Sequence, residues 1–266
     1  PGVAKDGVGK FTKDIIEKVS DNKDFEASLK NSGAEILINL LPVGSDKAVK
    51  FYAQCAINAK VGFINCIPVF IARDTEWYQK FRDNKVPLIG DDIKSQVGAT
   101  IVHRVLAQLF SDRGVKLKNT YQLNVGGNMD FLNMLEEDRL ETKRISKTSS
   151  VTSVANKGDG IEADNVRVGP SDYVKWLEDR KKAFIRLEGE SFGGAPLNIE
   201  VQLEVWDSPN SAGVTMDAVR YMKFFKDNDD LESLDLVSAW LMKAPAKSQK
   251  DGDVLMKLHE LTHVDK

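Results

Sequence analysis

Lys143 and Lys147 lie four residues apart in the charged segment LETKRISK. If this segment is helical, the two amines share one face of the helix. Two ammonium groups on one face repel each other unless an anion or a carboxylate lies between them. The spacing is therefore compatible with chemistry on an anion. A solvated basic face, the usual role of a Lys–Arg cluster, remains the alternative.

Polar and turn-forming residues follow each strand predicted in the first half of the chain. In an open α/β sheet, ligands bind outside the carboxyl ends of the strands, where loops gather backbone donors and side chains. Each segment alone could equally be a turn, because Gly, Asn, Asp and Pro are the preferred turn residues. The segments are residues 40–45, 65–68, 90–95 and 124–130.

Two other motifs give weak signals. The opening GVGKFTKD lacks a glycine at Ala4, which a phosphate-binding Walker loop would need, and Thr12 stands where a dinucleotide fingerprint has its third glycine. His259 and His263 have the i, i+4 spacing of a metal pair, but a tail helix with two surface histidines is the simpler interpretation. We expect His103, beside Arg104, to be solvated on the polar side of its helix.

Composition excludes several classes of protein. The 266 residues carry a net charge of −3, which argues against a general nucleic-acid binder, and are 42% hydrophobic, which is too high for a disordered chain. Two cysteines fit a reducing compartment. The longest apolar run, residues 61–72, is too short to cross a bilayer, and residues 1–10 lack the apolar core of a signal peptide. We expect a soluble, cytoplasmic protein that binds neither membrane nor nucleic acid.

The first third of the chain alternates strands and helices. Apolar runs at residues 36–41 and 61–65 flank a helical pattern that Ser45 or Asp46 would cap, which predicts a βαβ unit with parallel strands. A helix at 74–84, a strand at 86–89 and a loop leading into a helix that reaches Phe110 continue the pattern. The apolar side of that last helix is expected to consist of Ile101, Val105, Leu106, Leu109 and Phe110.

The middle of the chain predicts a second sheet. Strands are expected at 121–125, 184–191 and 197–206, the last two joined at Gly193-Gly194, and a mobile connection at 148–168. Strict alternation over 197–206 predicts an antiparallel sheet with one open face, exposed to water or to a partner subunit. Helices are expected at 214–225, 231–241 and 254–261. Asn210 or Ser211 would cap the first of these, and Asp207 would lie just before its N-terminus.

Several long motifs, in the same order along nearly the whole chain, resemble those of the myo-inositol-1-phosphate synthase family. Their sequences are most similar to the shorter bacterial and archaeal branch of that family. The resemblance is carried by GDDIKSQVGAT, NVGGNMDFLN, ETKRISKTSSV, EVWDSPNSAG and LMKAP, with support from LPVGS and INCIPVFIA. It implies an NAD-dependent isomerase that converts D-glucose 6-phosphate into 1L-myo-inositol 1-phosphate, for inositol and phospholipid biosynthesis. The implied steps are oxidation at C5, enolisation, attack of C6 on the C1 aldehyde, and reduction.

The resemblance also implies the site residues. Lys143 and Lys243 are assigned to the proton and hydride step at C5, and Lys147 and Lys181 to the substrate phosphate and the aldol oxyanion, with Asp130 and Asp207 holding them in register. A divalent or monovalent cation is a further implied cofactor, with no ligands assigned. The helix start at 95–100 would hold a phosphate, because free N–H groups and the helix dipole favour an anion. The implied contacts with NAD are Asn65, Cys66, Asp92, Ser95, Asn128, Met129, Asp130, Lys143, Asp179, Asp207 and Ser208.

The expected fold is α/β: a Rossmann-like parallel sheet with an inserted α+β domain. Residues 1–96 and 208–266 would form a partial NAD-binding domain, and residues 97–207 the catalytic and oligomerisation domain of a homotetramer. The family's opening strand and glycine-rich turn have no counterpart here, which predicts a chain that begins after them. Two alternatives stay open: an NAD(P)-dependent dehydrogenase of a phosphorylated small molecule, and an inactive truncated fragment that only binds or assembles.

Overall fold

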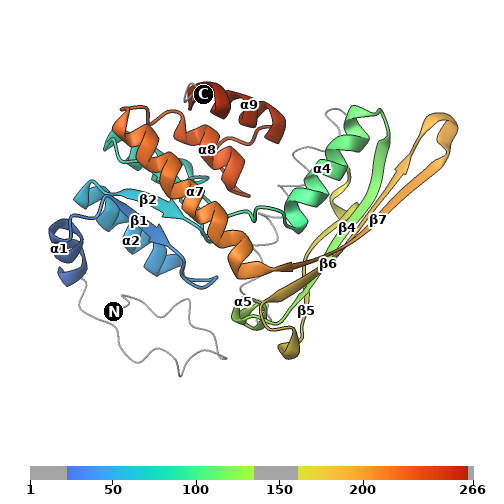
Figure 1. The fold of residues 1–266 in the computed structure, drawn as a ribbon, viewed down its shortest axis with the longest axis horizontal. Helices are drawn as coiled ribbons and strands as arrows, with labels where there is room; N and C mark the ends of the chain where they lie inside the picture. The colour runs from blue at the N-terminus through green and yellow to red at the C-terminus, as the bar shows by residue number, and fades with distance from the viewer. Residues whose placement is uncertain (1–22, 135–160, 263–266) are drawn as a thin grey trace. The chain divides into compact units, whose positions relative to one another are not determined.

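The computed structural model describes residues 23–134 and 161–262 (Figure 1). The chain divides into two compact units. We call Pro1–Ile93 with Val214–Lys266 the split unit, and Lys94–Gly213 the central unit. The functions assigned to the predicted domains, and their boundaries, stay predictions.

The split unit contains a parallel sheet of three strands in the order β1-β2-β3. Asn39 and Asn65, the last residues of β1 and β2, are paired in the register. The predicted βαβ unit is confirmed, because a helix joins β1 to β2 and the two strands run parallel. The elements are α1 (Lys23–Asn31), β1 (Ile36–Asn39), α2 (Asp46–Ala59), β2 (Gly62–Asn65), α3 (Thr75–Asp83) and β3 (Leu88–Ile89).

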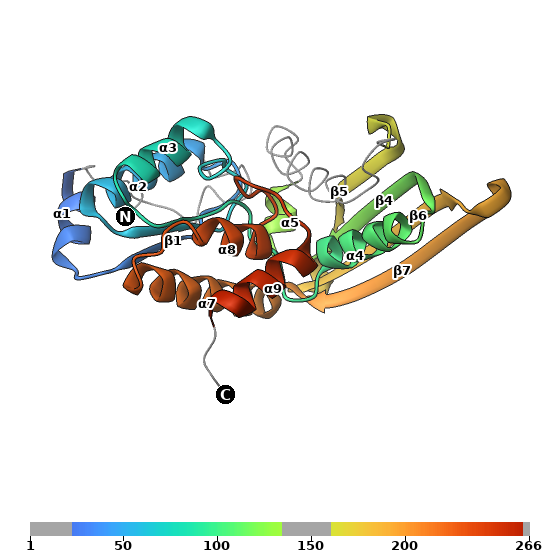
Figure 2. The same ribbon diagram turned by 90° about the horizontal axis from the view of Figure 1, so that it is seen from above.

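Helices cover both faces of this sheet (Figure 2). On one face, α2 and α3 pack Ala53 and Phe81 against Phe63. On the other face, Ile64 and Ile89 share a core with three C-terminal helices. These helices are α7 (Asp207–Asp227), α8 (Leu234–Leu241) and α9 (Asp251–Leu261).

Helix caps fix two of the loops that follow the strands. The carboxylate of Asp74 accepts from the N–H groups of Glu76 and Trp77, at 3.0 and 3.1 Å, and starts α3 as predicted. Ser45 occupies the N-cap position of α2, but its side chain makes no cap bond. Its hydroxyl donates instead to the carbonyl of Pro42, at 2.6 Å, and so closes the turn after β1.

The central unit contains a mixed sheet in the order β5-β4-β6-β7. β6 is antiparallel to both β4 and β7, as predicted, but β5 runs parallel to β4. The expectation of a purely antiparallel sheet was therefore wrong, as was the assignment of residues 166–168 to a connection; residues 148–160 lie outside the described residues. The strands are β4 (Lys116–Gly126), β5 (Val166–Tyr173), β6 (Arg180–Glu190) and β7 (Pro196–Trp206).

Helix α4 (Ala99–Asp112) packs on this sheet through a face that matches the predicted one only in part. Leu106 and Phe110 contact the core of the sheet as predicted. Val105 and Leu109 are 56% and 47% exposed, whereas His103 and Arg104 are buried. The His103 ring lies against β4, with Nε2 2.6 Å from the Thr120 hydroxyl. The predicted solvated His103 was wrong, because the inner face of β4 is itself polar and binds the ring.

Helix α7 begins at Asp207, three residues before the expected cap. Asn210 and Ser211 therefore lie inside the helix and do not cap it. The Asn210 side chain instead binds the backbone of Val97, donating to its carbonyl at 2.6 Å and accepting from its N–H at 3.1 Å. Asp207 does stand at the helix start, as predicted.

Among the described residues, no helix is both long and apolar enough to cross a bilayer.

Candidate functional site

In the split unit, Asp92 and Lys243 form an ion pair at the carboxyl edge of the parallel sheet. Asp92 follows β3, and Lys243 lies two residues beyond the end of α8. The Lys243 N–H donates to the Asp92 carbonyl at 2.7 Å, which brings the two segments together. The Lys243 amine then lies 2.8 Å from the Asp92 carboxylate, and the side chains are only 15% and 5% exposed. A sheltered pair of this kind can exchange a proton with a bound group.

The residues that end β2 lie beside this pair. The backbone carbonyl of Cys66 accepts from the N–H of Ile93 at 3.1 Å, and Asn65 is the last residue of the strand. Burial raises the pKa of the Cys66 thiol to about 12, although its hydrogen bond with Thr215 lowers it. The structure therefore gathers four predicted site residues of this unit along one edge: Asn65, Cys66, Asp92 and Lys243.

In the central unit, Lys181 and Asp207 form a second cluster with Asn128. Lys181 is the second residue of β6, and Asp207 is the first residue of α7. The Lys181 amine donates to one carboxylate oxygen of Asp207, and the Asn128 amide donates to the other at 3.2 Å. Asn128 also caps α5 (Met129–Asn133) by accepting from the N–H of Phe131. One carboxylate thus orients a cation and an amide.

Asp179 and Ser208 adjoin this cluster. The N–H and hydroxyl of Ser208 donate to the two oxygens of the Asp179 carboxylate, at 3.0 and 2.6 Å. Asp130 is partly buried on α5, next to Met129, which is 48% exposed. Ser95 is partly buried and lies ahead of α4.

Lys143 and Lys147 lie outside the described residues, so their placement stays a prediction. Their assignment rests on the motif ETKRISK alone. The same limit applies to His263, whereas His259 is exposed on α9, as expected of a surface histidine.

A close backbone approach shapes the central cluster. A Cβ atom on Gly127 would lie 2.4 Å from the nitrogen of Glu178 and 2.6 Å from the carbonyl oxygen of Val174. Only glycine allows the end of β4 to pass so near this loop. Because Glu178 precedes Asp179, the glycine helps to set the position of the Asp179 carboxylate.

Sequence reasoning missed several buried polar residues. Asp91 is completely buried, and Asn39 and Lys94 are 4% and 2% exposed. For Asn39 a signal was present, because it ends β1 just as Asn65 ends β2. For Asp91 and Lys94 the signal was weaker. Both lie in the motif GDDIKSQ, next to the predicted site residues Asp92 and Ser95, but nothing else marks them.

The chain is similar in sequence to known proteins over most of its length. A family model described as myo-inositol-1-phosphate synthase matches residues 98–208. An inositol-3-phosphate synthase from Mycolicibacterium smegmatis is 58% identical over 257 residues, which are 94% of this chain and 70% of that protein. A protein of the same name from Corynebacterium glutamicum is 52% identical over 256 residues, with 94% and 70% covered.

The fold has a counterpart among solved structures. The crystal structure of inositol-3-phosphate synthase from Caenorhabditis elegans superposes with a TM-score of 0.81 at 17% identity. The match covers 97% of this chain and 61% of that one. At this identity the likeness concerns the fold alone, and it supports the predicted α/β architecture.

Proposed function

The chain belongs to the myo-inositol-1-phosphate synthase family, and on that basis we propose that it isomerises D-glucose 6-phosphate to 1L-myo-inositol 1-phosphate with NAD as cofactor. The observation that carries the proposal is the 58% identity with the mycobacterial relative over 94% of the chain. The sheltered cations of both units are consistent with it, because the reaction develops negative charge on oxygen.

The donor set at the edge of the parallel sheet fits a nicotinamide cofactor. NAD, when bound, would take a hydride from C5 of the sugar and return it later in the same turnover. The Asp92 carboxylate can accept hydrogen bonds from ribose hydroxyls, and the Lys243 amine can donate to an oxygen of sugar or cofactor. This position, outside the carboxyl ends of parallel strands, is where open α/β sheets bind nucleotides.

In the split unit, the proposed role of Lys243 is to take up the proton of the C5 hydroxyl once its own ammonium proton has passed to the Asp92 carboxylate, and to return that proton later in the turnover. Its pairing with Asp92 holds the amine within a defined geometry, because the backbones of the two residues are also bonded to each other. A base that must act at one oxygen gains most from such orientation. Lys143 is proposed to share this step, through the family motif.

In the central unit, the proposed role of Lys181 is to bind the substrate phosphate or the oxyanion of the aldol step. Asp207 orients its amine from one side while Asn128 fixes Asp207 from the other. Lys147 would act with it, and Asp130 would orient one of these lysines. Asp179 and Ser208, which bind each other, are proposed contacts of the cofactor together with Ser95 and Met129.

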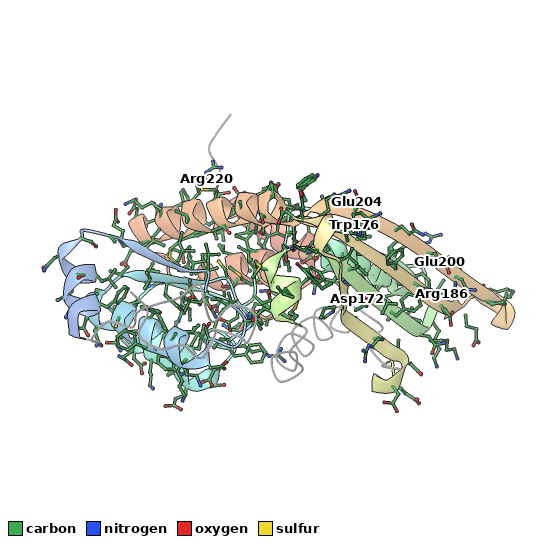
Figure 3. All side chains as sticks on the ribbon, turned by 90° about the horizontal axis from the view of Figure 1, so that it is seen from below. Asp172, Trp176, Arg186, Glu200, Glu204 and Arg220 are labelled. Atoms are coloured by element: carbon green, nitrogen blue, oxygen red, sulfur yellow. The ribbon has the colours of Figure 1, made fainter. Side chains whose placement is uncertain are left out.

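The proposed homotetramer would use the outer face of the mixed sheet. Trp176 and Trp206 are 69% and 56% exposed, and Phe184 is 36% exposed on the same side as Gln202. Arg186 and Glu200 form an ion pair on this face, and both are labelled in Figure 3. Exposed aromatic residues and arginine are enriched at protein interfaces. Ultracentrifugation of a Trp206→Glu variant should then show smaller assemblies than the unchanged protein.

Two further parts of the proposal concern a cation and the cellular location. A metal or monovalent cation stays a prediction: in residues 23–134 and 161–262, no group of three or more His, Cys, Asp or Glu side chains could hold a metal. A cytoplasmic location is consistent with Cys55 and Cys66, which are both free thiols and buried.

The test is turnover by the protein at its full natural length, given glucose 6-phosphate and NAD⁺. We expect inositol phosphate to form without net NADH. Accumulation of NADH in step with product would instead favour a dehydrogenase. Binding without turnover by the 266-residue chain itself would favour the fragment. The sequence relatives favour neither alternative.

A further inference from the structure

Asp91 is a completely buried carboxylate whose oxygens are each bound by two N–H donors. One oxygen accepts from the backbone of Ile71 and Arg73, at 2.9 and 3.0 Å. The other accepts from the backbone of Ala72, at 3.1 Å, and from the side chain of Asn65, at 2.7 Å. The carboxylate therefore fixes the loop that follows β2.

The network continues across the sheet through side-chain amides. Asn65 also donates to the carbonyl of Val69, at 2.6 Å, and accepts from the Asn39 amide, at 2.7 Å. Asn39 in turn accepts from the N–H of Leu41 in the loop after β1. One buried chain of polar groups thus ties together the segments that follow all three strands.

The backbone of Asp91 binds the segment that carries Lys243. Its N–H donates to the carbonyl of Ala244 at 3.2 Å, and its carbonyl accepts from the N–H of Ala244 at 3.0 Å. The next residue, Asp92, pairs with Lys243 through both backbone and side chain. A shift of the Asp91 peptide would therefore move both members of that ion pair.

A buried carboxylate at this position is costly unless its four N–H donors stay in place. Burial raises the pKa of Asp91 to about 7, although the N–H groups of Arg73, Ala72 and Ile71 and the Asn65 amide lower it. An apolar residue here would leave the N–H groups of Ile71, Ala72 and Arg73 and the Asn65 amide without this acceptor, which is costly for buried donors. What the carboxylate supplies is a fixed geometry for several backbone segments at once.

We propose that Asp91 is a positioning residue, whose carboxylate holds the loop at residues 69–73 against the peptide that presents Asp92 and Lys243. The inference rests on the proposed function, because it concerns how that pair meets substrate and cofactor. Asp91 itself touches neither, since its side chain is enclosed by the loop and by Asn65.

The test variant is Asp91→Asn in the protein at its full natural length. Asparagine has the same shape, but in either orientation its NH₂ group faces two N–H donors, so the loop must move. We expect kcat for inositol phosphate formation to fall about 10- to 100-fold, as for a misplaced catalytic group. Tyr78→Phe is the matched control: it removes the hydrogen bonds to Asp235, elsewhere in the same unit, and should leave kcat within twofold.

A readout without turnover separates positioning from general damage. By hydrogen exchange, Asp91→Asn should lose protection in peptides that cover residues 69–73 and 242–245, with the rest of the unit unchanged. In a double-mutant cycle with Asp92→Asn, the two effects on kcat should be clearly less than additive, because Asp91 acts through Asp92. A merely structural role would lower protection throughout the unit and leave the two effects additive.

The outcomes are separable. Activity within twofold of the unchanged protein in Asp91→Asn, or additivity in the cycle, overturns the inference. If Asp91→Asn does not fold, Asn39→Ala decides, since it removes the far end of the same network; we expect a loss of about 3- to 10-fold, and unchanged kcat refutes the inference. An inactive unchanged protein refutes the proposed function instead, and the exchange data then still report on the loop.

Discussion

The amine of Lys243 lies 2.8 Å from the carboxylate of Asp92, although 151 residues separate them in the chain. The parallel sheet supplies one partner after β3, and the helical layer supplies the other after α8. Both side chains are mostly shielded from water. Within the split unit, this pair is the arrangement on which the proposed proton transfer depends.

Removal of one partner should cost stability as well as activity. Lys243→Met leaves the Asp92 carboxylate buried without its cation, which costs about 3 kcal/mol in comparable pairs. We expect activity to fall at least about 100-fold, the range for loss of a general acid–base group. Denaturant unfolding should show that Lys243→Met with Asp92→Asn is more stable than Lys243→Met alone, because asparagine removes the unpaired charge and tolerates the positive φ of this position.

Lys247 offers a control at the same distance. Its amine also lies 2.8 Å from a carboxylate, that of Asp235, but the lysine side chain is 65% exposed. Lys247→Met should therefore cost less than about 1 kcal/mol, the usual value for a surface pair. If Lys243→Met and Lys247→Met lower the free energy of unfolding equally, the Lys243–Asp92 pair is not shielded from water as the structure indicates.

His103 should make the central unit sensitive to acid. Burial lowers its pKa from 6.5 to about 4, so the folded protein keeps the ring neutral while the unfolded chain takes up a proton. The stabilisation is complete above about pH 6.5 and is lost as the pH falls towards 4. The change can reach about 3 kcal/mol. The unfolding free energy of the unchanged protein, minus that of His103→Gln, should shrink by this amount between pH 7 and 4; parallel curves would refute the account.

Gly127 should tolerate no side chain. A methyl group there would meet backbone atoms of Glu178 and Val174, which cannot rotate away. Gly127→Ala should lower the unfolding free energy by about 1–3 kcal/mol, as overpacking does, and weaken NAD binding through Asp179. Gly252→Ala is the control, because nothing lies within 4 Å of its added carbon on α9, and a stabilisation of up to about 1 kcal/mol is expected there.

Both cysteines should be unreactive in the folded protein. Burial raises the pKa of Cys55 to about 11 and that of Cys66 to about 12, so neither forms the thiolate that reacts at pH 8. A chromogenic disulfide reagent should titrate no thiol before unfolding and both thiols afterwards. Rapid labelling of Cys66 in the native state would show that the edge of the sheet is more open than the structure has it.

The apolar patterns predicted most elements because their strands are buried on one or both faces. They were less accurate where polar residues meet inside the fold. Because α4 turns His103 towards Thr120, hydrophobic periodicity identified only part of the buried face, which includes Phe110 but not Val105. β5 was missed because Gly169 and Pro170 lie within it. Family motifs, and not spacing, led to Asp92 and Lys243, and nothing in the local sequence distinguishes Asp91 from a turn residue.

The central claim is that one hydride leaves C5 of the sugar and returns to the same carbon. The direct measurement is mass spectrometry of inositol phosphate made from glucose 6-phosphate that carries deuterium at C5. With the protein at its full natural length and NAD⁺, we predict that product forms only when NAD⁺ is present and keeps the deuterium. Product that has lost the label to solvent, or that forms equally well without NAD⁺, would contradict the account.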